Sequence, residues 1–121
     1  MKFLQRTAFD NEISQAKQLI TSGNLDEGFA HLERAHVIGQ AFVAPHVKSH
    51  WLMLKVEFQR RQPAAVLGQL ARIMLGALGS AVGVVPVGNT GGTNISMFKP
   101  MPIAPELQKL IDGDAQPDAR V

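Results

Sequence analysis

The sequence predicts an all-α protein: an antiparallel array of four main helices, then a packed Gly/Pro-rich loop and a short C-terminal helix. Apolar residues recur at three- and four-residue spacing over most of residues 8–78, as on the buried face of a helix. Gly, Asn and Pro interrupt this periodicity and mark the helix ends. The chain has 121 residues, 45% of them hydrophobic, which is enough for one core. We expect one helical domain over residues 1–111 and a disordered tail over residues 112–121.

The first two helices are expected over residues 8–21 and 25–40. Ser22-Gly23-Asn24 separates them, and Gly and Asn tolerate the left-handed conformation that often ends a helix. So short a connection requires the two helices to lie antiparallel. The pair resembles one unit of a tetratricopeptide repeat. No second copy follows at a period near 34 residues, however, so a generic helical hairpin is the better interpretation.

The next two helices are expected over residues 45–60 and 63–78, each beginning at a proline. Their periodicity predicts an inward-facing set on the third helix of Val47, Trp51, Leu54 and Phe58. On the fourth helix the apolar set is Val66, Leu67, Leu70, Ile73, Met74 and Leu78. Gly68 and Gly76 would each weaken an isolated helix by roughly 1 kcal/mol, which suggests close packing of another segment there.

Residues 79–105 carry too many glycines and prolines for a long helix and too many apolar residues for a solvated linker. We expect a loop packed on the helices, with one short hairpin around Asn89-Thr90-Gly91-Gly92. A last short helix is expected over residues 105–111. The glycine segment could also offer backbone N–H groups to an anion, although it lacks the lysine of a phosphate-binding loop.

Composition excludes several classes of protein. The chain has no cysteine, which removes disulfides, thiolate metal sites and cysteine nucleophiles. The net charge is only +2 and the basic residues are scattered, so we expect no nucleic-acid partner. No secretory signal is visible at the N-terminus, which predicts a cytoplasmic protein. The most apolar stretch, residues 73–87, is shorter than the roughly 20 residues of a membrane span, so we expect no membrane partner.

The histidines provide the main functional signal. His46 and His50 are four residues apart in one predicted helix, so their imidazoles project from one face and could bind one metal ion. His36 lies at a similar height on the preceding antiparallel helix, so three imidazoles could converge. Glu33 precedes His36 by three residues and is a candidate fourth ligand. His31 points elsewhere on its helix.

Three imidazoles suit zinc, copper(II), nickel or iron(II), and spacing alone does not choose among them. Val47 stands where a His-Glu-x-x-His hydrolase has its glutamate, which disfavours metalloprotease chemistry. The alternative for these histidines is a structural role, with imidazoles hydrogen-bonded in the core at a helix junction.

Several motifs together resemble a small bacterial domain family of unknown function: Ala35-His36-Val37-Ile38-Gly39-Gln40, His46-x-x-x-His50-Trp51-x-Met53-Leu54, Gly68-Gln69-x-x-Arg72-Ile73 and Gly88-Asn89-Thr90-Gly91-Gly92. The resemblance spans residues 8–111. It implies metal handling, because members of this family are often encoded beside heavy-metal resistance genes. It also implies a polar pocket or anion site formed by Gln40, Gln69, Arg72, Asn89 and Thr90.

Three functions follow as hypotheses. The leading one is a small metal-binding or metal-response accessory protein that uses His36, His46 and His50. The second is a helical module that binds an unknown protein partner or self-associates, which exposure of Met97, Phe98 and Met101 would support. The third is an enzyme with His50, Arg72 and Asn89 in its pocket, although no nucleophile–base pair can be assigned from spacing.

Overall fold

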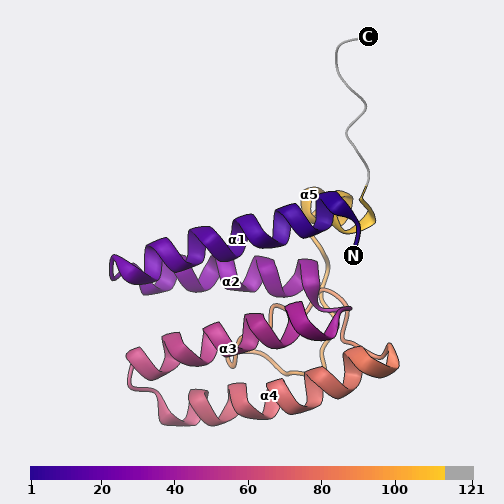
Figure 1. Ribbon diagram of the computed structural model, residues 1–121. Helices are drawn as coiled ribbons and strands as arrows, with labels where there is room; N and C mark the ends of the chain where they lie inside the picture. The colour runs from indigo at the N-terminus through magenta and orange to yellow at the C-terminus, as the bar shows by residue number, and fades with distance from the viewer. Residues whose placement is uncertain (114–121) are drawn as a thin grey trace.

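The computed structural model describes residues 1–113 and shows five α-helices, with no strand among these residues (Figure 1). They are α1 (Phe3–Thr21), α2 (Leu25–Gly39), α3 (Val43–Gln59), α4 (Pro63–Val82) and α5 (Pro105–Asp112). The four long helices run antiparallel to their neighbours in chain order, with α4 at the outer edge (Figure 1). The all-α array and the short C-terminal helix are therefore confirmed. The tail predicted over residues 112–121 lies outside the described residues beyond Gly113.

The α1–α2 hairpin holds much of the hydrophobic core. Phe9, Ile13 and Ala16 of α1 are buried against Leu32 and Ala35 of α2, among others. Gly23 ends the turn with φ of +86°, a conformation that favours glycine. The first helix begins five residues earlier than its apolar periodicity predicts. Buried Gln5 accounts for this, because its side chain donates a hydrogen bond to the Ile38 carbonyl, 2.9 Å away.

The buried face of α3 differs from the predicted one. Trp51 and Phe58, predicted to face inward, are 49% and 73% exposed. The buried face instead contains both apolar and polar residues: Pro45, His46, Ser49, His50, Leu52, Met53, Val56 and Glu57. Apolar periodicity misassigned this face because histidines and Ser49 occupy places that a hydrophobic core normally gives to aliphatic side chains.

The apolar face of α4 points away from the core, contrary to the prediction. Leu67, Met74 and Leu78 are 66%, 75% and 63% exposed. Only Gln69 and Ser80 are buried on this helix. Among the described helices, α4 packs against α3 alone, at the edge of the array (Figure 1). By length and composition it is also the one described helix that could cross a membrane.

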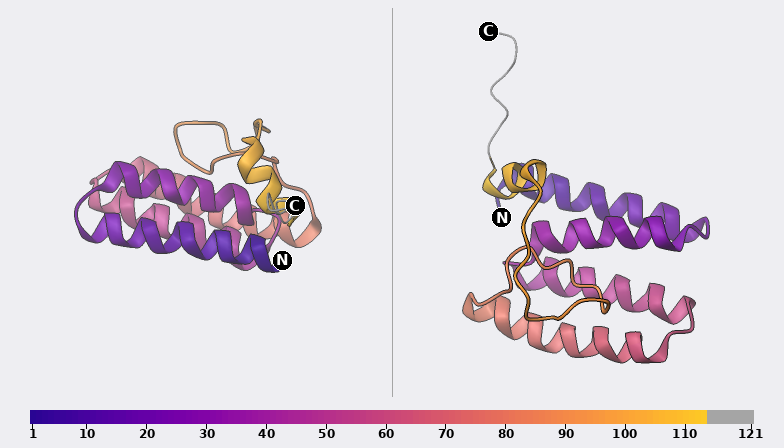
Figure 2. Two further views of the ribbon diagram at one scale, coloured as in Figure 1. Left: turned by 90° about the horizontal axis from the view of Figure 1, so that it is seen from above. Right: turned by 180° about the vertical axis from the view of Figure 1, so that it is seen from behind.

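The segment between α4 and α5 runs along one side of the helical array (Figure 2). It forms turns and no hairpin of strands, because the Asn89 side chain closes the loop internally rather than pairing two extended segments. The helix before it continues four residues past the predicted end and stops at Gly83, whose φ of +78° is left-handed. At the other end, α5 packs on α1 and α2 through buried Leu107.

Candidate metal centre

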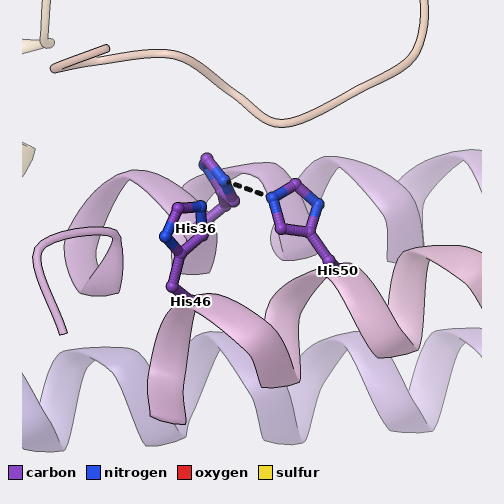
Figure 3. Close-up of side chains that lie close together, drawn as sticks. All are labelled: His36, His46 and His50. Atoms are coloured by element: carbon purple, nitrogen blue, oxygen red, sulfur yellow. Dashed lines mark hydrogen bonds between the residues drawn. The ribbon is translucent and has the colours of Figure 1, made fainter. Parts of the chain in front are cut away.

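The structure brings the three predicted imidazoles together. His36 comes from the last turn of α2, and His46 and His50 come from consecutive turns of α3 (Figure 3). The ring centroids lie 4.5 to 5.0 Å apart. One nitrogen from each ring lies within 4.8 Å of one from each of the others. The antiparallel packing of α2 and α3 thus places the three rings around one point, as their spacing predicts.

Each histidine donates its Nδ1–H to a different acceptor outside the cluster. His36 Nδ1 donates to the Asn89 carbonyl at 2.7 Å, and His50 Nδ1 donates to Gln69 Oε1 at 2.7 Å. The Gln69 orientation is set because its Nε2 donates to the Gly91 carbonyl at 3.1 Å. His46 Nδ1 donates to Ser80 Oγ at 2.6 Å, and the Ser80 hydroxyl in turn donates to the Gln40 carbonyl at 2.7 Å.

These acceptors assign the same tautomer to all three rings. A neutral imidazole with its proton on Nδ1 has a bare lone pair on Nε2. The Nε2 atoms of His36 and His50 face each other at 3.0 Å (Figure 3). His46 turns its Nε2 edge toward the same point (Figure 3). The Nε2 lone pairs of the three rings therefore face one another, with no proton between them.

Burial keeps the rings neutral. The three side chains are only 2 to 3% exposed. Desolvation lowers the pKa of His46 and His50 to about 4, and the Gln69 hydrogen bond opposes this only partly at His50. The pKa of His36 is held well below its usual value by burial and then by the neighbouring His50 and His46. A proton is thus an unfavourable bridge between these nitrogens.

Two glycines make room for the rings. A Cβ at Gly76 of α4 would lie 2.9 Å from His46 Cε1 and 3.0 Å from its Nε2. A Cβ at Gly91 would lie 2.7 Å from His36 Cδ2, and its φ of +84° also favours glycine. Neither site could carry a side chain without displacing an imidazole. Gly76, which would weaken an isolated helix, is therefore needed in α4 to leave room for the His46 ring.

The predicted pocket residues separate into distinct roles. Gln69 contacts the cluster directly, whereas Asn89 does so through its backbone carbonyl. The Asn89 side chain holds the loop, because its Nδ2 donates to the Ser96 and Lys99 carbonyls at 2.8 Å each. Gln40 also binds the loop, with its Nε2 on the Pro86 carbonyl and its Oε1 accepting from the Gly88 amide. Neither side chain is free to act on a substrate.

Arg72 lies near the cluster, and its positive charge lowers the pKa of both His36 and His50. Its two terminal nitrogens donate to the Gly68 and Ile95 carbonyls at 3.1 and 3.0 Å. Its Nε is buried without an acceptor among the described residues.

Glu33 does not join the three imidazoles as a ligand. Burial raises the pKa of Glu33, opposed by Arg60 and by a hydrogen bond from Thr90. Within residues 1–113, the group of ligand atoms close enough for one ion contains the three histidines and not Glu33. His31 is bound to Glu12 at 2.6 Å, as expected for a histidine outside the cluster.

The glycine loop is engaged within the chain rather than open as an anion nest. The Asn89 amide donates to the Pro86 carbonyl, and the Gly91 amide donates to Asn89 Oδ1. The Gly88 amide donates to Gln40 Oε1, so three backbone amides of this segment already have acceptors within the chain. The loop serves as a wall that supports His36 and Gln69.

Sequence reasoning missed Ser80, and it expected close packing at Gly76 without connecting this glycine with the histidines. Both lie on a stripe of small and polar residues along α4, at spacings of three and four: Gln69, Arg72, Gly76 and Ser80. On a helix with so apolar a sequence, this stripe signals a polar inward face. Apolar periodicity points to the leucine side instead, because it assumes that the more hydrophobic face of a helix is the buried one.

The fold and site thus define an all-helical domain with a buried cluster of three histidines. The family model described as "Protein of unknown function (DUF3703)" matches residues 4–111, and the chain belongs to this family. The match covers the span over which a family resemblance was expected. No curated protein and no solved structure matches the chain significantly. The family description names no activity, so function must be inferred from the site.

Proposed function

We propose that this protein is a small metal-binding or metal-response accessory protein of the bacterial cytoplasm. One divalent transition metal is held by the Nε2 atoms of His36, His46 and His50. The observation that carries the proposal is the shared tautomer: all three Nδ1 groups donate outward, which leaves three lone pairs directed at one point. Histidine ligands in metal sites typically donate their other ring N–H to such an acceptor.

A cation resolves the contact between His36 and His50. Two lone pairs at 3.0 Å repel, and burial makes a bridging proton unfavourable. A tetrahedral zinc ion with bonds of about 2.0–2.1 Å would place its nitrogens about 3.3 Å apart. The His36–His50 separation of 3.0 Å is already close to that value. All the ligand nitrogens lie within 4.8 Å of one another, so the most distant pair would have to approach by no more than about 1.5 Å.

The donor set limits the metals. Three neutral imidazoles suit zinc, copper(II), nickel or iron(II), whereas calcium and magnesium prefer oxygen ligands. A carboxylate ligand is not needed, and Glu33 stays with Thr90 in this proposal. The protein ligands occupy three positions of a tetrahedral ion and leave the fourth open.

The test compares two histidine variants. Purified untagged protein is analysed for bound metal by mass spectrometry, and zinc, copper and nickel are titrated by calorimetry. We expect one tight site in wild type, lost in His50→Ala and unchanged in His31→Ala, since His31 is bound to Glu12 outside the cluster. Circular dichroism checks that both variants are folded. Equal metal affinity in the two folded variants would refute the proposal.

The outer face of α4 favours a second candidate function, self-association. The face carries no charged residue, because the one charge on α4, Arg72, is directed to the loop. Exposed apolar residues line it and continue onto the loop: Leu67, Leu70, Met74, Leu75, Leu78, Val82, Val84 and Phe98. Phe98 is 71% exposed, as expected for a docking surface, whereas Met97 and Met101 are half-buried.

The area of this face suits a second copy of the chain. Full burial of an aliphatic side chain removes roughly 60–120 Å² of apolar surface, and of an aromatic roughly 150–250 Å². Weighted by exposure, the eight residues present on the order of 500 Å² per copy. Two copies would bury about 1,000 Å², which meets the lower limit of a specific interface.

Sedimentation velocity tests this second function. We expect a wild-type dimer and a monomeric Met74→Lys variant, because a charge in the middle of the apolar face opposes its burial. Phe3→Lys is the control, since Phe3 is 81% exposed on α1 at the opposite side of the array. A monomeric wild type would refute self-association. Binding of the monomer to lipid vesicles would then identify a membrane surface as the occupant of this face.

A further inference from the structure

The histidine cluster opens into a cavity of about 560 Å³ between the second half of α4 and the loop that follows it. The three imidazoles and Arg72 line part of it, which we call its polar end. Volumes of about 300–1,000 Å³ are typical of small-molecule sites. The cavity therefore leads to the open coordination position of the metal site proposed above, on which the present inference rests.

The polar end of the cavity has an excess of positive charge. A divalent ion on three neutral imidazoles keeps its full charge, and the Arg72 guanidinium adds one more. Arg72 makes no ion pair within residues 1–113, and no Asp or Glu of this part of the chain lines the cavity. Arg72 is only partly buried, and water can occupy the fourth position of such an ion. An anion from outside the chain would also pair with both positive charges, so it fits this position better than water does.

The remaining walls are apolar. Leu75, Leu78 and Val82 of α4 and Val84 and Phe98 of the loop line the cavity. These five residues also belong to the exposed apolar face described above, so the cavity is open to that face. An inorganic anion would satisfy the charge and leave these walls in contact with water. An anion with an apolar body would satisfy both ends of the cavity.

We propose that the cavity binds a monocarboxylate with an apolar tail. The carboxylate replaces water at the open position of the metal and lies beside the Arg72 guanidinium, and the tail packs on the leucine and valine side chains. A carboxylate is favoured because it carries a single charge and is the usual partner of a guanidinium.

Cobalt(II)-loaded protein provides the test, because its visible absorption reports the ligands of the ion directly. Acetate, hexanoate and hexanol are titrated in turn. Each buried methylene is worth about fourfold in affinity, so hexanoate should bind at least about tenfold more tightly than acetate. Hexanol, which has the same chain length and no charge, should leave the spectrum unchanged. Equal binding of acetate and hexanoate, or a response to hexanol, would overturn the proposal.

Two leucines on α4 form a matched pair for this titration. Leu78 lines the cavity and is 63% exposed, whereas Leu67 lies outside it and is 66% exposed. Leu78→Ser should weaken hexanoate several-fold and leave acetate unchanged, and Leu67→Ser should weaken neither. Arg72→Gln should weaken both carboxylates without changing their ratio.

The two proposals fail in different ways. Absence of cobalt binding would appear before any carboxylate is added and would overturn the metal site together with this inference. Cobalt binding without a preference for the longer chain would overturn the inference alone.

Discussion

Replacement of Gly76 by alanine tests the metal centre without removing any hydrogen bond or ligand. The new methyl carbon would lie 2.9 Å from His46 Cε1 and 3.0 Å from its Nε2, the edge that faces the other imidazoles. An ordinary contact is about 3.5–4.0 Å, so the ring must move by about 0.5 Å or more. Metal–ligand distances tolerate only about 0.2 Å. We expect zinc affinity to fall about 10–100-fold, or about 1.4–2.7 kcal/mol.

The stability of the helix should change in the opposite direction. Alanine is favoured over glycine in a helix interior by about 1 kcal/mol, which offsets part of the new contact. Gly68→Ala is the matched control on the same helix, because its Cβ would meet Thr93 Cγ2 at 2.9 Å and Arg72 Nη1 at 3.2 Å but no imidazole. Calorimetric zinc titration and urea unfolding separate affinity from stability. A folded Gly76→Ala variant that binds zinc within threefold of wild type would refute the geometry proposed for this site.

Three further predictions concern the groups around the cluster. Gln69→Leu removes the acceptor of the His50 Nδ1–H, so we expect about 10–100-fold weaker zinc binding and about 1–3 kcal/mol lower stability, measured by calorimetry and urea unfolding. The metal-free protein should lose stability as pH falls below about 6.5. His46 and His50 have a pKa of about 4 in the folded protein, against an ordinary value of 6.5, so the unfolded chain binds more protons in this range. The slope should reach about 1.4 kcal/mol per pH unit for each histidine and level off near pH 4, and a flat profile in urea unfolding would contradict it. Asn89→Ala removes three hydrogen bonds that close the loop, so we expect about 3 kcal/mol lower stability and faster limited proteolysis within residues 83–104.

Helix number and order were accessible from the sequence, and so were the boundaries marked by glycine or proline, such as the end of α1 and the starts of α4 and α5. Local signals suffice for these features, because Gly23, Pro63 and Pro105 act on the backbone near their own positions. The convergence of the three histidines also followed from spacing. His46 and His50 share a face at four-residue separation, and a short connection places His36 on the antiparallel neighbour.

The orientation of α3 and α4 could not be obtained in this way. Periodicity locates an apolar face but does not say that it is buried. Here the apolar face of α4 lies at the edge of the array, and no helix within residues 1–113 covers it. The buried side of α4 is instead its small and polar stripe, because Ser80 and Gln69 supply acceptors to histidines of another helix.

An all-α domain, its helix order and a candidate set of three imidazoles could be inferred from the amino-acid sequence, because these features depend on spacing along one chain segment or across one short turn. Within residues 1–113, the tautomers, the exclusion of Glu33 from the cluster, the space left by Gly76 and the unpaired guanidinium of Arg72 could be seen only in the folded structure. These features depend on atoms far apart in the chain, such as those of His46 and Ser80 or of His36 and Asn89, whose contacts form only when the helices and the loop pack together.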